Sequence, residues 1–127
     1  MKASSKAASL PKKPRDLPVV VVTSVGTEEQ ALNIAHHLVA EGLAACVNIV
    51  PGVRSVYFWK EKVNDDGEFL LFVKTVPARF EAVRRTIKEL NAYELPEILA
   101  FPVAAADAAF AKWVARSSRG AKVETRD

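Results

Sequence analysis

The chain has 127 residues, half of them apolar and about a quarter charged, which is the usual composition of one globular domain. Its net charge of +3 comes from the two ends, because residues 1–18 carry a net charge of +4 and residues 116–127 a net charge of +2. The segment between them is therefore net negative, and nucleic acid is not an expected partner, since its recognition needs basic side chains clustered on a folded surface. No apolar run reaches the roughly 18–20 residues of a membrane span, so no membrane association is expected.

Composition also predicts the domain limits. Residues 1–16 are rich in Lys, Ser, Ala and Pro and predict a disordered basic tail, with a remnant of an organelle transit segment as the alternative. Residues 17–117 form the expected folded domain, and residues 118–127 a flexible C-terminal tail. The only cysteine, Cys46, excludes an internal disulfide and is compatible with a reducing, cytoplasmic location.

The folded region begins with a strand and a helix. Residues 17–22 are a Val-rich run, which is typical of a central strand buried on both faces. Thr27 followed by Gln30 is a capping box, so a helix is expected to begin there. Gly42 is placed to end this helix, because glycine readily adopts the left-handed conformation found after a helix C-terminus.

A long β-hairpin is expected next. Its first strand begins at Leu43, kinks at Pro51-Gly52 and continues as a second extended piece over residues 53–63. Asp66-Gly67 is a common hairpin turn sequence, so the chain is expected to reverse there and return over residues 68–75. The two arms of this predicted hairpin are unequal.

The remaining pattern completes an α+β fold. Pro77 opens a second amphipathic helix, residues 91–97 form a loop, residues 98–103 a fourth strand, and Asp107 caps an extra C-terminal helix. This order predicts a ferredoxin-like split βαβ sandwich with a long kinked hairpin and two helices on one face of an antiparallel sheet.

The second half of the hairpin is longer than a four-stranded sheet can pair. Residues 53–63 contain Tyr57, Phe58 and Trp59, and consecutive residues of a strand point to opposite faces. An overhang with aromatic side chains on both faces would leave a large apolar surface in a monomer. We therefore expect a closed homo-oligomer in which this strand pairs with another copy of the chain.

Three motifs carry a resemblance to a known family. They are Leu43–Trp59 (LAACVNIVPGVRSVYFW), Lys74-Thr75, and Tyr93–Ile98 (YELPEI). In this order they resemble the signature of the CutA divalent-cation tolerance family, and the match covers roughly residues 19–115. The resemblance implies a tight homotrimer of ferredoxin-like subunits and a role in tolerance of divalent metals, copper above all.

The metal ligands expected from this resemblance are incomplete in this chain. The usual family sequence His-Pro-Tyr-Glu is here Asn-Ala-Tyr-Glu, so Asn91 replaces the imidazole. Thr23 stands where some members have a cysteine. Glu94 and Glu97 remain as candidate metal ligands, and carboxylates alone suit hard cations better than copper.

A ligand-binding cleft between subunits is also expected. Its candidate residues are Trp59, Lys74, Tyr93 and Glu94, with Lys74 as a partner for one of the carboxylates across a subunit boundary. For each of these residues an ordinary structural role is the alternative: a packed interface tryptophan, an exposed strand-end lysine, or a solvated loop glutamate.

The sequence contains no phosphate-binding loop, zinc-protease motif or nucleophile elbow, so no enzymatic activity is expected. The first hypothesis is a non-enzymatic homotrimer that acts in divalent metal-ion (copper) tolerance. The alternative is a signalling trimer resembling PII-type proteins, which would bind small anions through Arg54, Lys60 and Lys74. A purely structural trimer is the third reading.

Overall fold

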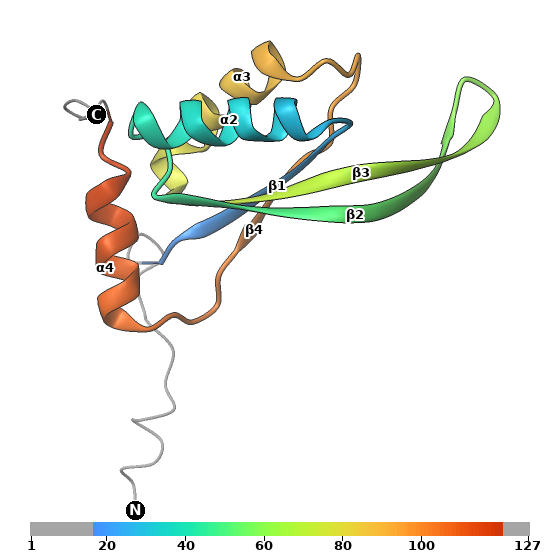
Figure 1. Ribbon diagram of the computed structural model, residues 1–127. Coiled ribbons are helices and arrows are strands. Elements are labelled where there is room, and N and C mark those ends of the chain that lie inside the picture. Colours follow the sequence, from blue (N-terminus) through green and yellow to red (C-terminus); the bar gives the residue numbers. More distant parts are fainter. Residues whose placement is uncertain (1–16, 121–127) are drawn as a thin grey trace, which may run out of the picture.

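The structure, a computed structural model, describes residues 17–120 and contains a four-stranded antiparallel sheet with two helices on one face (Figure 1). Its elements are β1 (Val19–Val25), α2 (Glu28–Ala40), β2 (Cys46–Trp59), β3 (Lys62–Thr75), a 3-10 turn (Pro77–Arg79), α3 (Phe80–Leu90), β4 (Ile98–Pro102) and α4 (Ala108–Ser117). The strand order is β2-β3-β1-β4. The predicted α+β, ferredoxin-like arrangement with an extra C-terminal helix is confirmed. None of the helices in the described part of the chain has the length and apolar character needed to cross a membrane.

The hydrophobic core lies between the sheet and the two helices α2 and α3. Ile34 and Leu38 of α2, Ile87 of α3 and Leu71 of β3 are fully buried in it. The predicted cap of α2 is also present, because the Thr27 hydroxyl oxygen accepts a hydrogen bond from the Gln30 backbone N–H at 3.2 Å.

The hairpin turn lies at Lys60-Glu61, and the predicted turn at Asp66-Gly67 is wrong. Both Lys60 and Glu61 have positive φ, of 53° and 67°, as a two-residue turn requires. Asp66 and Gly67 lie inside β3, where Asp66 pairs with Ser55 of β2 and Gly67 pairs with Arg54. This register makes both arms 14 residues long and places the acidic side chains of β3 beside polar partners on β2.

The predicted kink at Pro51-Gly52 is confirmed. The pairing between β2 and β3 shifts register between Val50 and Val53, and Gly52 has a φ of +74°. Because glycine lacks a Cβ, it adopts this left-handed conformation at little cost. The bulge separates the part of the hairpin that belongs to the sheet from the part that extends beyond it.

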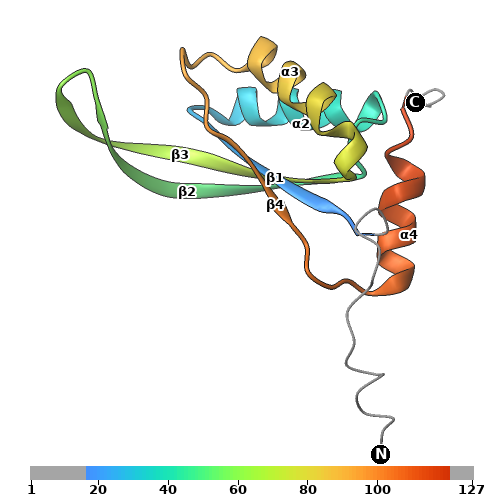
Figure 2. The same cartoon turned by 180° about the vertical axis from the view of Figure 1, so that it is seen from behind.

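We call residues 53–68 the overhang. β1 pairs with β3 only from Phe69 onwards, so within residues 17–120 no third strand pairs with the overhang. Figures 1 and 2 show it projecting well beyond the other strands, on the side away from α4. Val56, Phe58 and Val63 share one of its faces and are 65, 70 and 74% exposed, while Tyr57 and Trp59 point to the other face. The predicted overhang with aromatic side chains on both faces is therefore present.

The sheet has a second, partly uncovered apolar surface. Leu99 and Phe101 on β4 pair with Val22 and Val20 of β1, so they alternate with the strand residues that face the core. Both Leu99 and Phe101 remain about half exposed, as does Val50 of β2. β1, expected to be buried on both faces, is thus flanked on this surface by exposed apolar side chains.

The C-terminal end of the described chain is held against the body. Ser118, which follows α4, is buried, and the Arg79 Nε donates to its carbonyl oxygen at 2.8 Å. The Gly120 N–H donates to the Gly42 carbonyl oxygen at 3.0 Å. Residues 118–120, which fall in the predicted C-terminal tail, therefore contact the body of the domain. Residues 1–16 and 121–127, where the other tail predictions fall, lie outside the described residues.

Candidate functional site

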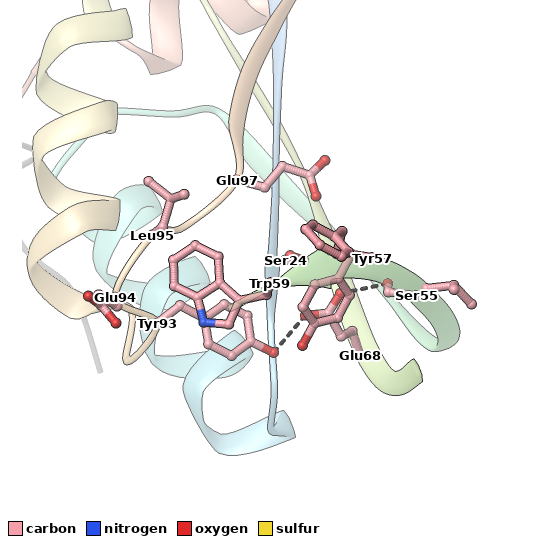
Figure 3. A pocket seen from close by; sticks show the side chains of 11 residues that line it. Ser24, Ser55, Tyr57, Trp59, Glu68, Tyr93, Glu94, Leu95 and Glu97 are labelled. Atoms are coloured by element: carbon pink, nitrogen blue, oxygen red, sulfur yellow. Dashed lines mark hydrogen bonds between the residues drawn. The ribbon is translucent and has the colours of Figure 1, made fainter. Parts of the chain in front are cut away.

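A pocket of about 520 Å³ lies between the overhang and the loop that follows α3 (Figure 3). The hairpin and the loop supply most of its wall, and the end of β1 supplies the rest. Its lining residues are Ser24, Ser55, Val56, Tyr57, Phe58, Trp59, Glu68, Tyr93, Glu94, Leu95 and Glu97. Its size is typical of a small-molecule site.

Glu68 is the central polar group of this pocket. The residue is only 8% exposed, and its two carboxylate oxygens accept hydrogen bonds from different elements. The Ser55 hydroxyl of β2 donates to Oε1 and the Tyr93 hydroxyl of the loop donates to Oε2, both at 2.6 Å (Figure 3). A carboxylate that is desolvated in this way is stabilised by such charge-assisted hydrogen bonds.

A second tyrosine–carboxylate pair lies beside the first. The Tyr57 hydroxyl donates to Asp66 Oδ2 at 2.5 Å, and this hydrogen bond raises the pKa of Tyr57. The pKa of Tyr93 is raised further, first by burial of its ring and then by its hydrogen bond to Glu68. Both phenols therefore remain protonated hydrogen-bond donors at neutral pH, and neither is suited to act as a general base.

The loop that carries Tyr93 is fixed by the side chain of Asn91. This buried amide donates to the Ser24 carbonyl oxygen at 3.1 Å and accepts from the Tyr93 backbone N–H at 2.9 Å. Gln30 accepts from the Ala92 N–H at 2.8 Å, which ties the same loop to α2. The Tyr93 ring can approach the end of β1 because residue 26 is glycine, where an added Cβ would lie only 3.1 Å from the Tyr93 hydroxyl oxygen.

Trp59, Lys60 and Glu94 form the outer part of the site. The Lys60 ammonium lies 5.8 Å from the centre of the Trp59 ring and 3.7 Å from Glu94 Oε1. Both charged side chains of this ion pair are mostly exposed, so the pair itself contributes little to stability. Its geometry nevertheless shows that an alkylammonium group can contact the ring and the carboxylate together.

Most of the residues predicted for the cleft lie in this pocket. Trp59, Tyr93 and Glu94 line it, and so does Glu97, which was predicted only as a metal ligand. Lys74 does not, because its ammonium group donates to Asn48 Oδ1 within the four-stranded part of the sheet. Its predicted pairing with a carboxylate of another subunit stays a prediction.

The two candidate metal ligands are not brought together. Figure 3 shows the carboxylates of Glu94 and Glu97 on different sides of the pocket, and Glu94 already pairs with Lys60. Among residues 17–120 no group of three or more His, Cys, Asp or Glu side chains is arranged to hold a metal ion. Asn91, where the resemblance led us to expect histidine, is buried and bonded to backbone groups. Within one chain these residues therefore do not fit a copper site.

Glu68, Ser55 and Asp66 were not predicted as site residues. Their signal was present, because Ser55 and Tyr57 alternate along one arm and Asp66 and Glu68 along the other. With the turn placed at Asp66-Gly67, however, these two pairs could not lie opposite one another. The register error therefore removed the central carboxylate from the predicted site.

Comparison with known proteins agrees with this architecture. Residues 19–117 match the family model described as CutA1 divalent ion tolerance protein. The chain is 45% identical over 95 residues to the divalent-cation tolerance protein CutA of Thermus thermophilus, an alignment that covers 75% of this chain and 92% of the relative. It is 36% identical over 118 residues to the chloroplastic protein CutA 1 of Oryza sativa, covering 92% of this chain and 67% of the relative.

Solved structures give the same result. The crystal structure of CutA1 from Oryza sativa superimposes with a TM-score of 0.80 at 36% identity, over 84% of this chain and 98% of that one. The divalent cation tolerance protein of Thermus thermophilus superimposes with a TM-score of 0.78 at 42% identity, over 80% of this chain and 99% of that one. The chain therefore belongs to the CutA1 divalent ion tolerance protein family.

Proposed function

We propose that this protein acts in divalent-cation tolerance as a non-enzymatic homotrimer in the cytoplasm. Membership of a family named for that role supports the first part of the proposal. The overhang is the observation that carries the second part, since Val56, Phe58 and Val63 are exposed apolar side chains on one of its faces. A second copy of the chain would cover this surface and complete the unpaired edges of the hairpin.

Sedimentation equilibrium of the full chain tests the assembly, with a trimer mass as the expected result. Replacing both Phe58 and Val63 by Ser should shift the mass toward the monomer, because it removes apolar area from the proposed interface. Leu32→Ser is the matched control, since Leu32 is also an exposed apolar side chain but lies on α2. A stable monomer of the wild-type chain at micromolar concentration would contradict the proposal.

Copper binding needs more ligands than residues 17–120 bring together in one chain, so a copper site at Glu97 would draw further ligands from a neighbouring subunit. Calorimetric titration with Cu²⁺ of the wild-type chain and of Glu97→Ala tests this directly. Loss of binding in Glu97→Ala, with Glu89→Ala unchanged as the matched control on α3, would support a shared site. Equal heats for all three proteins would exclude Glu97 as a ligand.

Small-molecule sensing is the second candidate function, and the 520 Å³ pocket is the observation that favours it. The basic residues expected to hold an anion do not line this pocket. Arg54 pairs with Asp65 at 2.8 Å, Lys60 with Glu94, and Lys74 with Asn48. A thermal-shift screen with charged metabolites tests this function, and the absence of any stabilising compound would count against it.

A further inference from the structure

The pocket has a uniform charge. Among residues 17–120, its lining includes three carboxylates, those of Glu68, Glu94 and Glu97, and no Lys, Arg or His side chain, while the Lys60 ammonium lies at its rim beside Glu94. We propose that it binds an organic ammonium cation, with Glu68 as the counter-charge and aromatic rings as the wall. This inference rests on the second candidate function, in which the pocket binds a small molecule.

Glu68 is the strongest reason for a cationic ligand. Its carboxylate is buried, and among residues 17–120 no cationic side chain forms a salt bridge with it. Burial of an unpaired charge is costly, and hydrogen bonds from two hydroxyl groups offset only part of that cost. Each oxygen accepts one of these hydrogen bonds and keeps a further lone-pair direction for a ligand. A ligand ammonium would supply the missing positive charge.

The aromatic residues favour an alkylated ammonium over a metal ion. Tyr57, Trp59 and Tyr93 all line the pocket, and Figure 3 shows their rings around its polar centre. Aromatic faces attract cations electrostatically and also cover methyl or methylene groups, as in sites for quaternary ammonium compounds. A metal ion would instead need several oxygen ligands around one point, which the separated carboxylates do not provide.

Lys60 gives a direct precedent within the chain. Its ammonium group lies over the Trp59 ring and beside Glu94, so the rim of the pocket already holds a primary alkylammonium group. A ligand cation would use the same two kinds of partner, an aromatic face and a carboxylate, deeper in the pocket beside Glu68. Lys60 is therefore a competing internal cation, and its removal should strengthen ligand binding.

The test is a calorimetric titration of the full-length oligomer with choline and with its uncharged analogue 3,3-dimethyl-1-butanol. The two compounds have nearly the same shape, so a difference between them reports the charge. Choline is expected to bind at least about tenfold more tightly, which corresponds to ~1.4 kcal/mol of cation-specific interaction. Equal affinities, or no choline binding at all, would overturn the proposal.

Three variants locate the binding. Glu68→Gln keeps the shape of the side chain and should weaken choline binding about tenfold or more. Glu89→Gln, which removes an exposed charge from α3, should leave it unchanged. Lys60→Asn should strengthen it, because asparagine tolerates the positive φ at this position and carries no competing charge. An unchanged affinity in Glu68→Gln would refute the assignment even if choline binds.

Mass and copper titrations on the same samples separate this inference from the proposed function. If the chain forms trimers but binds 3,3-dimethyl-1-butanol more tightly than choline, the assembly proposal stands and the proposed ligand class is wrong. If the chain is a monomer that binds choline through Glu68, the proposed ligand class stands and the proposed assembly is wrong. Melting temperatures of each variant without ligand show whether a lost affinity comes from misfolding.

Discussion

Tyr93 donates its phenolic hydrogen to Glu68 Oε2 at 2.6 Å and thereby joins the loop after α3 to the overhang. The two residues are 25 positions apart and belong to segments with different backbone anchors. Asn91 fixes the loop against β1, and the pairing with β2 fixes Glu68. The pocket exists because these two independently positioned segments meet at this hydrogen bond.

Tyr93→Phe is expected to destabilise the protein by about 1.5–3 kcal/mol, because it leaves a buried carboxylate with one donor instead of two. Tyr57→Phe removes the same type of bond from an exposed pair and should cost only about 0.5 kcal/mol. Urea denaturation at one fixed subunit concentration measures both variants, since stability of an oligomer depends on concentration. Equal losses in the two variants would show that burial of Glu68 is not the deciding factor.

The alkaline limit of stability should depend on Tyr93. Its pKa in the folded protein is raised above the value of about 10 expected when the chain is unfolded. A group of this kind contributes stability that is fully present below the unfolded pKa and is lost as the pH rises through the folded pKa. Between about pH 10 and 12, the wild-type protein should therefore lose more stability than Tyr93→Phe.

Ultraviolet absorbance of tyrosinate checks the same point directly, because the chain has only two tyrosines. In the native protein neither should ionise at the usual pH of about 10, whereas in denaturant both should. Tyr57→Phe isolates the signal of Tyr93. Ionisation of Tyr93 near pH ~10 in that folded variant would contradict the buried hydrogen bond.

The order of helices and strands could be predicted because each has its own local signal. The Val run of β1, the capping residue Thr27 and the proline at position 77 each act within a few residues of the element that they define. The position of the hairpin turn could not be predicted, because Asp66-Gly67 is a good local turn sequence and the contacts that fix the register lie between the two arms. Inside β3, Asp66 accepts from Tyr57, an interaction available only in the longer register.

The candidate site could be predicted in part. Trp59, Tyr93, Glu94 and Glu97 were found from the resemblance to a family, which requires no register. Glu68 was missed because its role arises from burial and from partners on two distant segments. The role of Asn91 in fixing the loop was not predicted either. The sequence shows only that asparagine stands at position 91, and its hydrogen bonds to backbone groups depend on the fold.

Restoring histidine at position 91 should not create a copper site by itself. The Asn91 side chain points to the Ser24 carbonyl oxygen and the Tyr93 N–H, and it does not line the pocket. Asn91→His should therefore leave the calorimetric response to Cu²⁺ unchanged. Asn91→Ala should cost about 1–3 kcal/mol, because it leaves two backbone groups at a buried position without a partner. Strong copper binding in Asn91→His would show that the side chain can reach other ligands.

Changing the turn residues Lys60 and Glu61 should increase the stability of the protein. Both residues have positive φ, which costs a residue other than glycine about 1 kcal/mol or more. Replacing them with Asn-Gly, the sequence preferred for this turn, should stabilise the protein by about 1–2 kcal/mol despite the loss of the exposed ion pair with Glu94.

Asp66→Asn is the control, because it creates Asn-Gly at positions 66 and 67. If the chain turned there, Asp66→Asn would be the stabilising change. In the observed register it should bring no gain, since residue 66 is a strand residue bonded to Tyr57.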